Sequence, residues 1–392
     1  MFYRAMYTAV SLFSGAGGID LGFAKAGFKV VEAHDFDPVA VSVFNANISN
    51  VAKVTDLSHS QIKLPKVDAV FAGPPCQGFS TIGKMASDDA RNKLFLKSCK
   101  LAVSALPKII VIENVPSIAS ARYNEVVARA ANFLKSKGYA VQTDILSAND
   151  FGVAQIRRRF FMIARKGSSD FHFDWKHQKS KTVENAFAEI AYSQTPIEFE
   201  RGTAFRAISE KIAQGQKLCN VRGGENSIHT WDIPSVFGEV TEQERIILQA
   251  ILTLRRTERK RNFGDADPVT YDRIRDLNGR ECKRVLNMLM HKKYLKKIGS
   301  LYDLTHTFNG TFRRLRLSGP SPTVDTHFSN PRLFLHPTRH RGMTYQEAAS
   351  LQGFPADYKW PEKSASQFRM IGNAVPPPLA YAVGKFCRGL IT

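Results

Sequence analysis

Short apolar runs alternate with helical patterns through the first 165 residues of the chain. Runs rich in Val, Ile and Phe that are bounded by polar or glycine residues are typical of buried strands. Between them, segment 38–47 opens with Pro38 at a first-turn position and segment 123–137 ends before Gly138, and both are helix signals. Strands that alternate with helices predict an α/β fold with a doubly wound, mostly parallel sheet. The expected strands are 7–13, 28–34, 69–72, 109–112, 140–146 and 160–163.

The pattern changes after about residue 168, where KGSSDFHFDWKHQKSK is typical of a polar linker. Over 241–305, three amphipathic segments precede the hairpin-like KKIGSLYDLT, and this order predicts a winged helix. A small helical insert with solvated basic faces is the alternative. The expected division is a first domain of 1–168 with 364–392, a second of 169–330, and a connecting segment, 331–363, that contains LQGFP.

Charge and composition narrow the class of protein. Of the 392 residues, 55 are Lys or Arg and 35 are Asp or Glu, which gives a formal net charge of +20. Such an excess predicts a polyanionic partner, with nucleic acid as the leading candidate. No stretch approaches the ~20 apolar residues of a membrane span, and the N-terminal residues lack a signal-peptide pattern, so neither membrane insertion nor secretion is expected.

The cysteines are scattered singly, without a Cys-x-x-Cys pair. This pattern argues against a disulfide framework or a zinc module, so we expect a reducing compartment and no metal site. The five are Cys76, Cys99, Cys219, Cys282 and Cys387.

A glycine-rich turn follows the first expected strand, in LFSGAGGIDLGF. Gly15 and Gly18 would let a ligand approach the backbone beside a helix N-terminus, although a glycine turn without a ligand remains the alternative. The next strand ends at Asp35, where a carboxylate would bind ribose hydroxyls, and Phe36 could cover a base. Asp56, after a further β-like segment, could accept a hydrogen bond from an adenine amino group. Together they predict a site for a nucleoside cofactor.

A second group of residues has the chemistry of nucleophilic catalysis. Cys76 follows two prolines in FAGPPCQGFS, which suits a rigidly held nucleophile better than a core residue, although single cysteines are usually buried. Glu113 follows the apolar run Ile-Ile-Val-Ile, where burial would raise the pKa of its carboxyl. Arg157 and Arg159 alternate on an extended segment and so share one face, with surface or phosphate contacts as the alternative.

The ordered motifs FxGxGG, PPCQGFS, ENV, QxRxR, LQGFP and GNAVPP resemble those of the DNA (cytosine-5)-methyltransferases of bacterial restriction-modification systems. The resemblance covers about residues 7–166 and 311–390, and the region between matches no motif and takes the place of the target-recognition domain. It implies the S-adenosylmethionine-dependent methyltransferase fold with a second, smaller recognition domain. It also implies transfer of a methyl group to C5 of a flipped-out cytosine in duplex DNA.

The resemblance assigns roles to individual residues. Cys76 would attack C6, Glu113 would bind N3 and the exocyclic amine, and Arg159, with Arg157 beside it, would contact O2. The implied cofactor residues are Phe13, Gly15, Gly18, Asp35, Phe36, Asp56, Leu94, Asn373 and Val375. Many relatives have Glu in place of Asp35, so the ribose contact here would be made by a shorter side chain.

Contacts to DNA are less specified by the sequence. The resemblance places Ser80 and Arg91 on a loop that closes over the flipped base. For base reading, the segment GRECKRVLNMLM offers one helix face with Arg280, Lys283, Arg284 and Asn287. This segment could instead bind only phosphates. In a further alternative, the base-reading loops are HTWDIPSVFG and RRLRLSGPSPTVDTHF. A transfer RNA methyltransferase and a catalytically inactive DNA-binding relative are the alternative functions. We expect a monomer in the bacterial cytoplasm, associated with the nucleoid and paired with an endonuclease that cuts the same site without contacting it.

Overall fold

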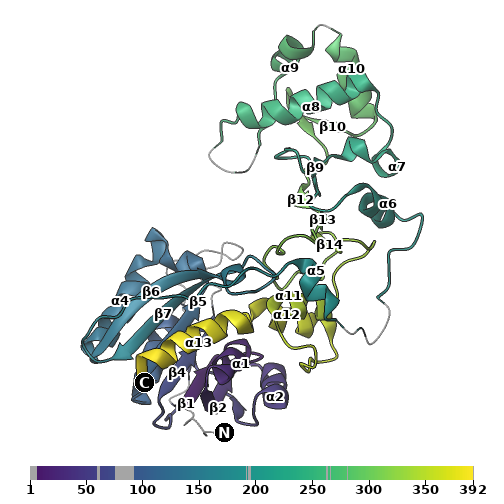
Figure 1. Cartoon of the computed structure of the whole chain (residues 1–392). Coiled ribbons are helices and arrows are strands. Elements are labelled where there is room, and N and C mark those ends of the chain that lie inside the picture. Colours follow the sequence, from purple (N-terminus) through teal and green to yellow (C-terminus); the bar gives the residue numbers. More distant parts are fainter. Residues whose placement is uncertain are drawn as a thin grey trace. The chain divides into compact units, whose positions relative to one another are not determined.

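The computed structural model describes residues 7–59, 62–75, 92–190, 192, 196–261, 264, 266–279 and 281–391 (Figure 1). The chain forms two compact units. Unit 1 consists of 1–192, 318–327 and 345–392, and unit 2 consists of 193–317 and 328–344. Of the residues singled out above, Cys76, Ser80, Arg91 and Arg280 lie outside the described residues.

A seven-stranded sheet in the order β3-β2-β1-β4-β5-β7-β6 forms the centre of unit 1. Strands β1 to β5 are parallel, whereas β7 pairs antiparallel with both β5 and β6. This confirms the expected doubly wound, mostly parallel sheet. The strands are β1 (Tyr7–Leu12), β2 (Phe28–Asp35), β3 (Ala52–Val54), β4 (Ala69–Ala72), β5 (Ile109–Asn114), β6 (Tyr139–Ser147) and β7 (Arg158–Lys166).

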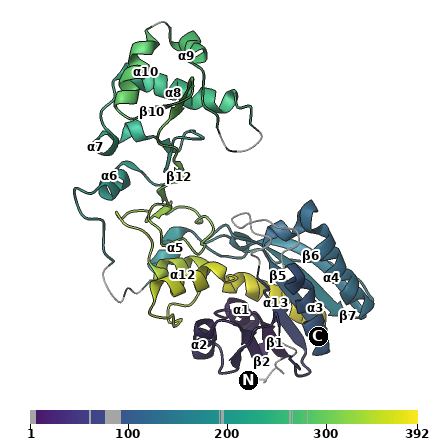
Figure 2. The ribbon, with the colours of Figure 1, turned by 180° about the vertical axis from the view of Figure 1, so that it is seen from behind.

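Helices cover both faces of the sheet because alternate side chains of each strand point to opposite faces. Val10, Val70 and Ile110 pack in one core with α3 and α4, which are visible from behind in Figure 2. Ala9 and Phe71 pack in the other core with α1 and α13, and α13 crosses this face in Figure 1. The helices are α1 (Gly18–Lys25), α2 (Pro38–Asn47), α3 (Asn92–Ser104), α4 (Asn124–Ser136) and α13 (Pro377–Ile391).

Three segments that the sequence assigned elsewhere, 169–192, 318–327 and 345–363, belong to unit 1. The expected linker after residue 168 packs on the C-terminal helix, where the Trp175 ring lies 4.8 Å from that of Phe386. The Ser350 hydroxyl of α11 (Tyr345–Gln352) donates to the Ala186 carbonyl of α5 (Val183–Ala188) at 2.5 Å. Unit 1 therefore includes 169–192, 318–327 and 345–363, whereas 331–344 of the expected connecting segment belongs to unit 2. The remaining helix of unit 1 is α12 (Ser364–Asn373), with short 3-10 turns at Pro116–Ala119, Ala121–Tyr123 and Ala148–Asp150.

Part of unit 2 packs around a small core formed by Ile208, Ile212, Leu218, Phe312 and Leu335. Short strands surround it, with β8 between β9 and β12, and β13 paired with β14. The elements are α6 (Ala204–Lys211), β8 (Lys217–Cys219), β9 (Ser227–Ile228), β12 (Asn309–Thr311), β13 (Arg313–Arg314) and β14 (Phe334–Leu335), with a 3-10 turn at Thr230–Asp232.

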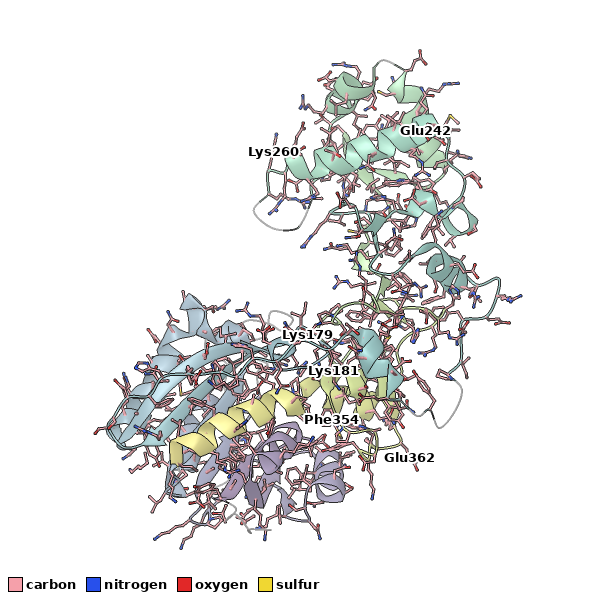
Figure 3. The ribbon with its side chains drawn as sticks, viewed as in Figure 1. Lys179, Lys181, Glu242, Lys260, Phe354 and Glu362 are labelled. Atoms are coloured by element: carbon pink, nitrogen blue, oxygen red, sulfur yellow. The ribbon has the colours of Figure 1, made fainter. Side chains whose placement is uncertain are left out.

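Residues 241–304 of unit 2 form a group of elements with its own core, here called the 241–304 module. It contains α8 (Glu242–Thr257), α9 (Tyr271–Asn278), α10 (Cys282–His291), β10 (Leu295–Ile298) and β11 (Leu301–Leu304), and α7 (Pro234–Phe237) precedes it. Figure 3 labels Glu242, in the first turn of α8, and Lys260, just past its end. Although α8 has 16 residues, no described helix is long and apolar enough to cross a membrane.

Candidate active site

A cavity of about 290 Å³ opens at the carboxyl ends of the parallel strands in unit 1. Ligands of doubly wound sheets bind at this edge, where the strand order reverses between β1 and β4. The cavity brings together most of the residues predicted from the sequence. Those that line it are Phe13, Gly15, Gly18, Asp35, Phe36, Glu113, Arg159, Asn373 and Val375.

The turn between β1 and α1 forms one wall of the cavity, and its glycines Gly15 and Gly18 have different structural roles. At Gly15, with φ +54°, an added Cβ would meet no heavy atom within 4 Å, so a ligand can approach the backbone there. At Gly18, an added Cβ would lie 2.4 Å from the Val375 carbonyl oxygen. Gly18 therefore allows the GNAV segment, from the other end of the chain, to close against the turn.

Asp35, the last residue of β2, fixes this turn. Its Oδ2 accepts a hydrogen bond from the Gly15 N–H at 2.8 Å, and its Oδ1 accepts one from the Asp37 N–H at 2.9 Å. Burial raises the pKa of Asp35, and these two N–H groups oppose the rise. Phe36 follows and is 63% exposed. An open backbone turn, a carboxylate at a strand end and an exposed aromatic ring fit the nucleoside part of a cofactor.

An ion pair at this cavity was not predicted from the sequence. Arg369 of α12 contacts Asp37, the N-cap residue of α2, with 2.5 Å between Nη2 and Oδ2, and both residues line the cavity. The sequence contains one indication that Arg369 lies at the cavity: it precedes Asn373 by four residues, which places both on one face of a helix.

Glu113 and Arg159 form the charged centre of the cavity. Glu113 lies within β5, next to its last residue, rather than just past its end as expected, and β7 runs antiparallel beside it. Arg159 Nε lies 2.8 Å from Glu113 Oε1, and the two side chains are only 12% and 11% exposed. Burial raises the pKa of Glu113, whereas Arg159 and Arg157 oppose the rise. The site therefore holds a carboxyl that can share a proton beside a fixed cation.

The chain reaches this cavity immediately before Cys76. Pro74 and Pro75 line the cavity, and the Asn114 side-chain amide donates to the Pro74 carbonyl at 3.2 Å. The other four cysteines are unsuited to nucleophilic attack because they are at most 1% exposed. Burial also raises the pKa of the Cys99 thiol to about 12.

Three of the described residues predicted for catalysis or cofactor binding do not line the cavity. Arg157 is 0% exposed and donates to the Val324 and Gly372 carbonyls, each at 2.7 Å. Asp56 is exposed and accepts hydrogen bonds from the backbone and hydroxyl of Ser58. Leu94 lies in α3 and is half-buried. Across the described residues, no group of His, Cys, Asp or Glu could hold a metal ion.

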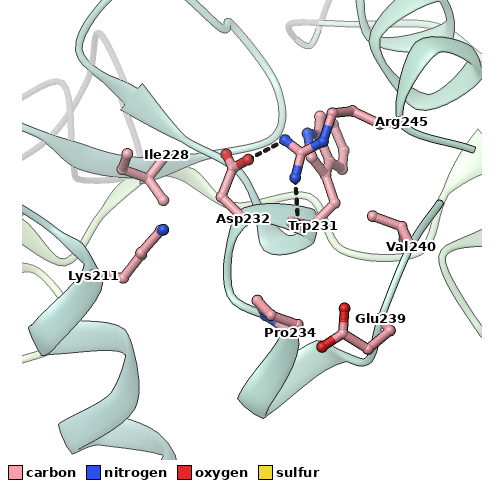
Figure 4. Close-up of a pocket in the computed structure, with 8 residues that line it drawn as sticks. All are labelled: Lys211, Ile228, Trp231, Asp232, Pro234, Glu239, Val240 and Arg245. Carbon is pink, nitrogen blue, oxygen red and sulfur yellow. Dashed lines mark hydrogen bonds and ion pairs between the residues drawn. The ribbon is translucent and has the colours of Figure 1, made fainter. Parts of the chain in front are cut away.

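A second cavity, of about 480 Å³, lies in unit 2 (Figure 4). Arg245 donates to Asp232 and to the Trp231 carbonyl on one side, and Lys211 points into the cavity from α6. Burial alone would raise the pKa of Asp232, but hydrogen bonds from His229 and Arg245 hold it well below its usual range. The ionised carboxylate of Asp232 thus holds the side chain of Arg245 in place.

The sheet order and the cavity are those expected of the S-adenosylmethionine-dependent methyltransferase fold. Among solved structures, the chain is similar to one described as a DNA modification methyltransferase encoded within a prophage (E. coli), with a TM-score of 0.60, 24% identity and coverage of 98% of this chain and 99% of that one. It is also similar to the S. pombe Dnmt2 methyltransferase, with a TM-score of 0.53, 18% identity and coverage of 98% and 100%. These likenesses concern the fold.

Sequence comparison identifies the family. The C-5 cytosine-specific DNA methylase family matches residues 7–388. The chain is 30% identical to the Type II methyltransferase M.HgiCII of Herpetosiphon aurantiacus, over 96% of this chain and 95% of that protein. It is also 30% identical to the Type II methyltransferase M.XorII of Xanthomonas oryzae pv. oryzae, over 96% and 83%. The chain belongs to the C-5 cytosine-specific DNA methylase family. It is a DNA cytosine-C5 methyltransferase, and its methyl donor is S-adenosylmethionine.

Proposed function

We propose that this enzyme methylates one cytosine within a specific duplex sequence through a covalent bond between Cys76 and C6, and thereby protects host DNA from a restriction endonuclease. The observation that carries the residue assignment is the Glu113–Arg159 pair, which shares a cavity with Pro75, the residue before Cys76. A nucleophile, a carboxyl that can share a proton and a cation are the three groups that this chemistry needs.

The roles follow from the chemistry of cytosine. C5 is a poor nucleophile until a thiolate adds to C6, which pushes electron density toward N3 and O2. Glu113 donates a proton or hydrogen bond to N3 and accepts from the exocyclic amine, and Arg159 stabilises negative charge at O2. S-adenosylmethionine supplies an electrophilic methyl group. A base then removes the C5 proton, and the electrons of that C–H bond expel the Cys76 thiolate.

The cofactor is held by residues of the first cavity. We assign Phe13, Gly15 and Gly18 to its methionine and adenosine parts, Asp35 to the ribose and Phe36 to the adenine face. Asn373 and Val375 close the cavity from the last motif. Asp56 and Leu94 keep their assignments from the family resemblance alone. Arg157 is a positioning residue, because its donors hold the backbone at Gly372, next to Asn373.

The division of labour places chemistry in unit 1 and DNA recognition in unit 2. The thiol must approach the face of the ring, so the cytosine leaves the stack, and Ser80 and Arg91 hold the sugar-phosphate beside it. Arg280, Lys283, Arg284 and Asn287 contact the duplex. We propose that the enzyme acts as a monomer on nucleoid DNA in a bacterial cytoplasm, with an endonuclease that shares its site but does not bind it.

Transfer of tritium-labelled methyl groups tests this assignment. The wild-type enzyme should label duplex DNA and not transfer RNA, and Cys76→Ala should abolish labelling while cofactor binding is retained. Bisulfite sequencing of plasmid DNA from expressing cells then identifies the methylated cytosine and its sequence context. Labelling that survives the substitution, or that occurs only on RNA, would refute the proposal.

A further inference from the structure

The 241–304 module has the element order of a winged helix, including a feature that its sequence did not suggest. Three helices precede the β10–β11 hairpin, and Val269, between α8 and α9, forms an antiparallel bridge with Tyr302 of β11. Its backbone N–H and carbonyl both bond to Tyr302, at 2.8 and 2.7 Å. This single bridge occupies the position of the short strand that, in a winged helix, follows the first helix and pairs with the hairpin.

Positive charge in this module is divided into two sets. Five arginines are each ion-paired with a carboxylate of the module or its flank: Arg245, Arg255, Arg261, Arg273 and Arg275. Eight other described cations are exposed and have no ion pair among the described residues: Arg256, Arg259, Lys260, Lys283, Arg284, Lys293, Lys296 and Lys297. Three of these lie at or just past the end of α8, and the other five lie on α10, on the turn after it and on β10.

The exposed face of α10 suits a base edge as well as a phosphate. Arg284, Asn287 and Met288 are exposed at helical spacing, whereas Val285 and Leu289 are buried in the core of the module. Arg and Asn read guanine and adenine by bidentate hydrogen bonds, and an apolar side chain contacts the thymine methyl group. Glu281 is the one described acidic residue of this helix and its N-cap.

The other candidate reading segments are partly buried. In HTWDIPSVFG, Thr230, Trp231 and Ile233 are at most 2% exposed. In RRLRLSGPSPTVDTHF, Arg314 is 4% exposed and its guanidinium donates to backbone carbonyls, including that of Ile212 at 2.6 Å. The exposed donors of the second segment, Arg316, Ser318, Thr323 and His327, lie on loops divided between unit 2 and unit 1 rather than on one face of a helix.

We propose that the 241–304 module is a winged helix that docks on duplex DNA, with α10 in the major groove and the β10–β11 hairpin on the neighbouring phosphates. The inference rests on the proposed division of labour, and it adds which module binds, which helix reads bases and which lysines bind phosphates. Lys296 and Lys297 lie beside the tight Gly299–Ser300 turn, where a hairpin can follow the backbone of the duplex.

The test compares two variants of the full-length enzyme that lose equal charge. Lys296→Ala with Lys297→Ala removes two unpaired cations, and Arg273→Gln with Arg275→Gln removes two that are already ion-paired on α9. Binding of each to a short random-sequence duplex is measured by fluorescence anisotropy across a salt series. We expect the hairpin variant to flatten the slope of log K against log salt by about 2, because each phosphate contact contributes about 0.9, and the α9 variant to keep the wild-type slope. Equal slopes for the two variants would overturn the proposal.

A third variant tests base reading, with readouts that separate this inference from the proposed function. Arg284→Ala with Asn287→Ala should weaken binding to the sequence that the enzyme recognises by about 10-fold or more, relative to binding of random duplex. Unchanged discrimination would contradict the placement of α10. Cofactor binding by isothermal titration should be unchanged in all three variants, since it depends on unit 1. Absence of methyl transfer by the wild-type enzyme would instead contradict the proposed function.

Discussion

Arg159 and Glu113 meet across two neighbouring antiparallel strands, with 2.8 Å between Nε and Oε1. The pair places a cation and a carboxyl side by side where a pyrimidine would present O2 and N3. Because the carboxyl is buried, its pKa is raised, and it can share a proton with a ring nitrogen instead of only accepting hydrogen bonds.

Glu113→Gln should slow methyl transfer without removing the cofactor site. The amide can donate a hydrogen bond but cannot share a proton, so we expect the single-turnover rate to fall by about 100-fold or more. Cofactor affinity, measured by isothermal titration, should stay within a few-fold of wild type. A variant with the wild-type rate would remove Glu113 from the mechanism.

Substitutions of the two arginines of the QxRxR motif should have different effects: one at Arg157 should lower stability, and one at Arg159 should lower activity. Arg157→Lys leaves buried carbonyls at Val324 and Gly372 without their donors, and we expect the free energy of unfolding to fall by about 3 kcal/mol. Arg159→Lys should retain the stability of the wild type and lose methyl transfer. Urea denaturation and single-turnover assays on both variants check this. Equal effects of the two substitutions on both measurements would contradict the distinction.

Phe36→Ala should weaken cofactor binding by about 10-fold, because stacking on a base contributes roughly 1–3 kcal/mol. Phe36 is 63% exposed, so loss of its ring should leave the unfolding transition in place. Leu106→Ala is the matched control, since Leu106 is also 63% exposed in unit 1 but does not line the cavity. Titration with S-adenosylhomocysteine measures both variants, and similar affinities for the two would argue against stacking on Phe36.

Asp20, in the first turn of α1, should make stability depend on pH. Burial raises its pKa to about 7, because both carboxylate oxygens are buried without a hydrogen-bond partner among the described residues and the nearby Ser11 opposes the rise only in part. The folded state therefore binds the proton more tightly than the unfolded chain. Stability from this group is complete below about pH 4 and is lost as the pH rises toward 7.

The variant Asp20→Asn removes this dependence. Its unfolding free energy, relative to wild type, should rise by about 1.4 kcal/mol for each pH unit between about 4 and 7. Glu125→Gln, an exposed carboxylate on α4, is the control and should show no such trend. Denaturant titrations across this range measure both differences, and parallel curves for wild type and Asp20→Asn would contradict the assignment.

The central sheet could be predicted from the sequence because its strands are apolar on both faces. Segment 109–112 is part of β5, and segment 38–47 coincides with α2, whose start is marked by Pro38 and the Asp37 cap. Asp35 ends β2 and Glu113 is the last residue but one of β5, so both lie at one edge of the sheet, as expected for parallel strands.

What the sequence did not reveal depends on contacts between distant segments. Nothing local distinguishes the buried Arg157 from Arg159, because burial of Arg157 follows from carbonyls at Val324 and Gly372. The Asp37–Arg369 ion pair likewise joins residues from opposite ends of the chain. The segment around Trp175 resembles a linker in sequence because the ring that Trp175 packs against, Phe386, lies far away along the chain.

The most direct test of the covalent route is a trapping experiment on duplex DNA that contains 5-fluorocytosine at the methylated position. Fluorine at C5 prevents loss of a proton, so the bond between Cys76 and C6 should persist after methyl transfer. We predict a denaturation-resistant protein–DNA complex that requires S-adenosylmethionine and that Cys76→Ala does not form. A stable complex with the alanine variant, or none with the wild-type enzyme under conditions where it methylates unmodified duplex, would contradict the account.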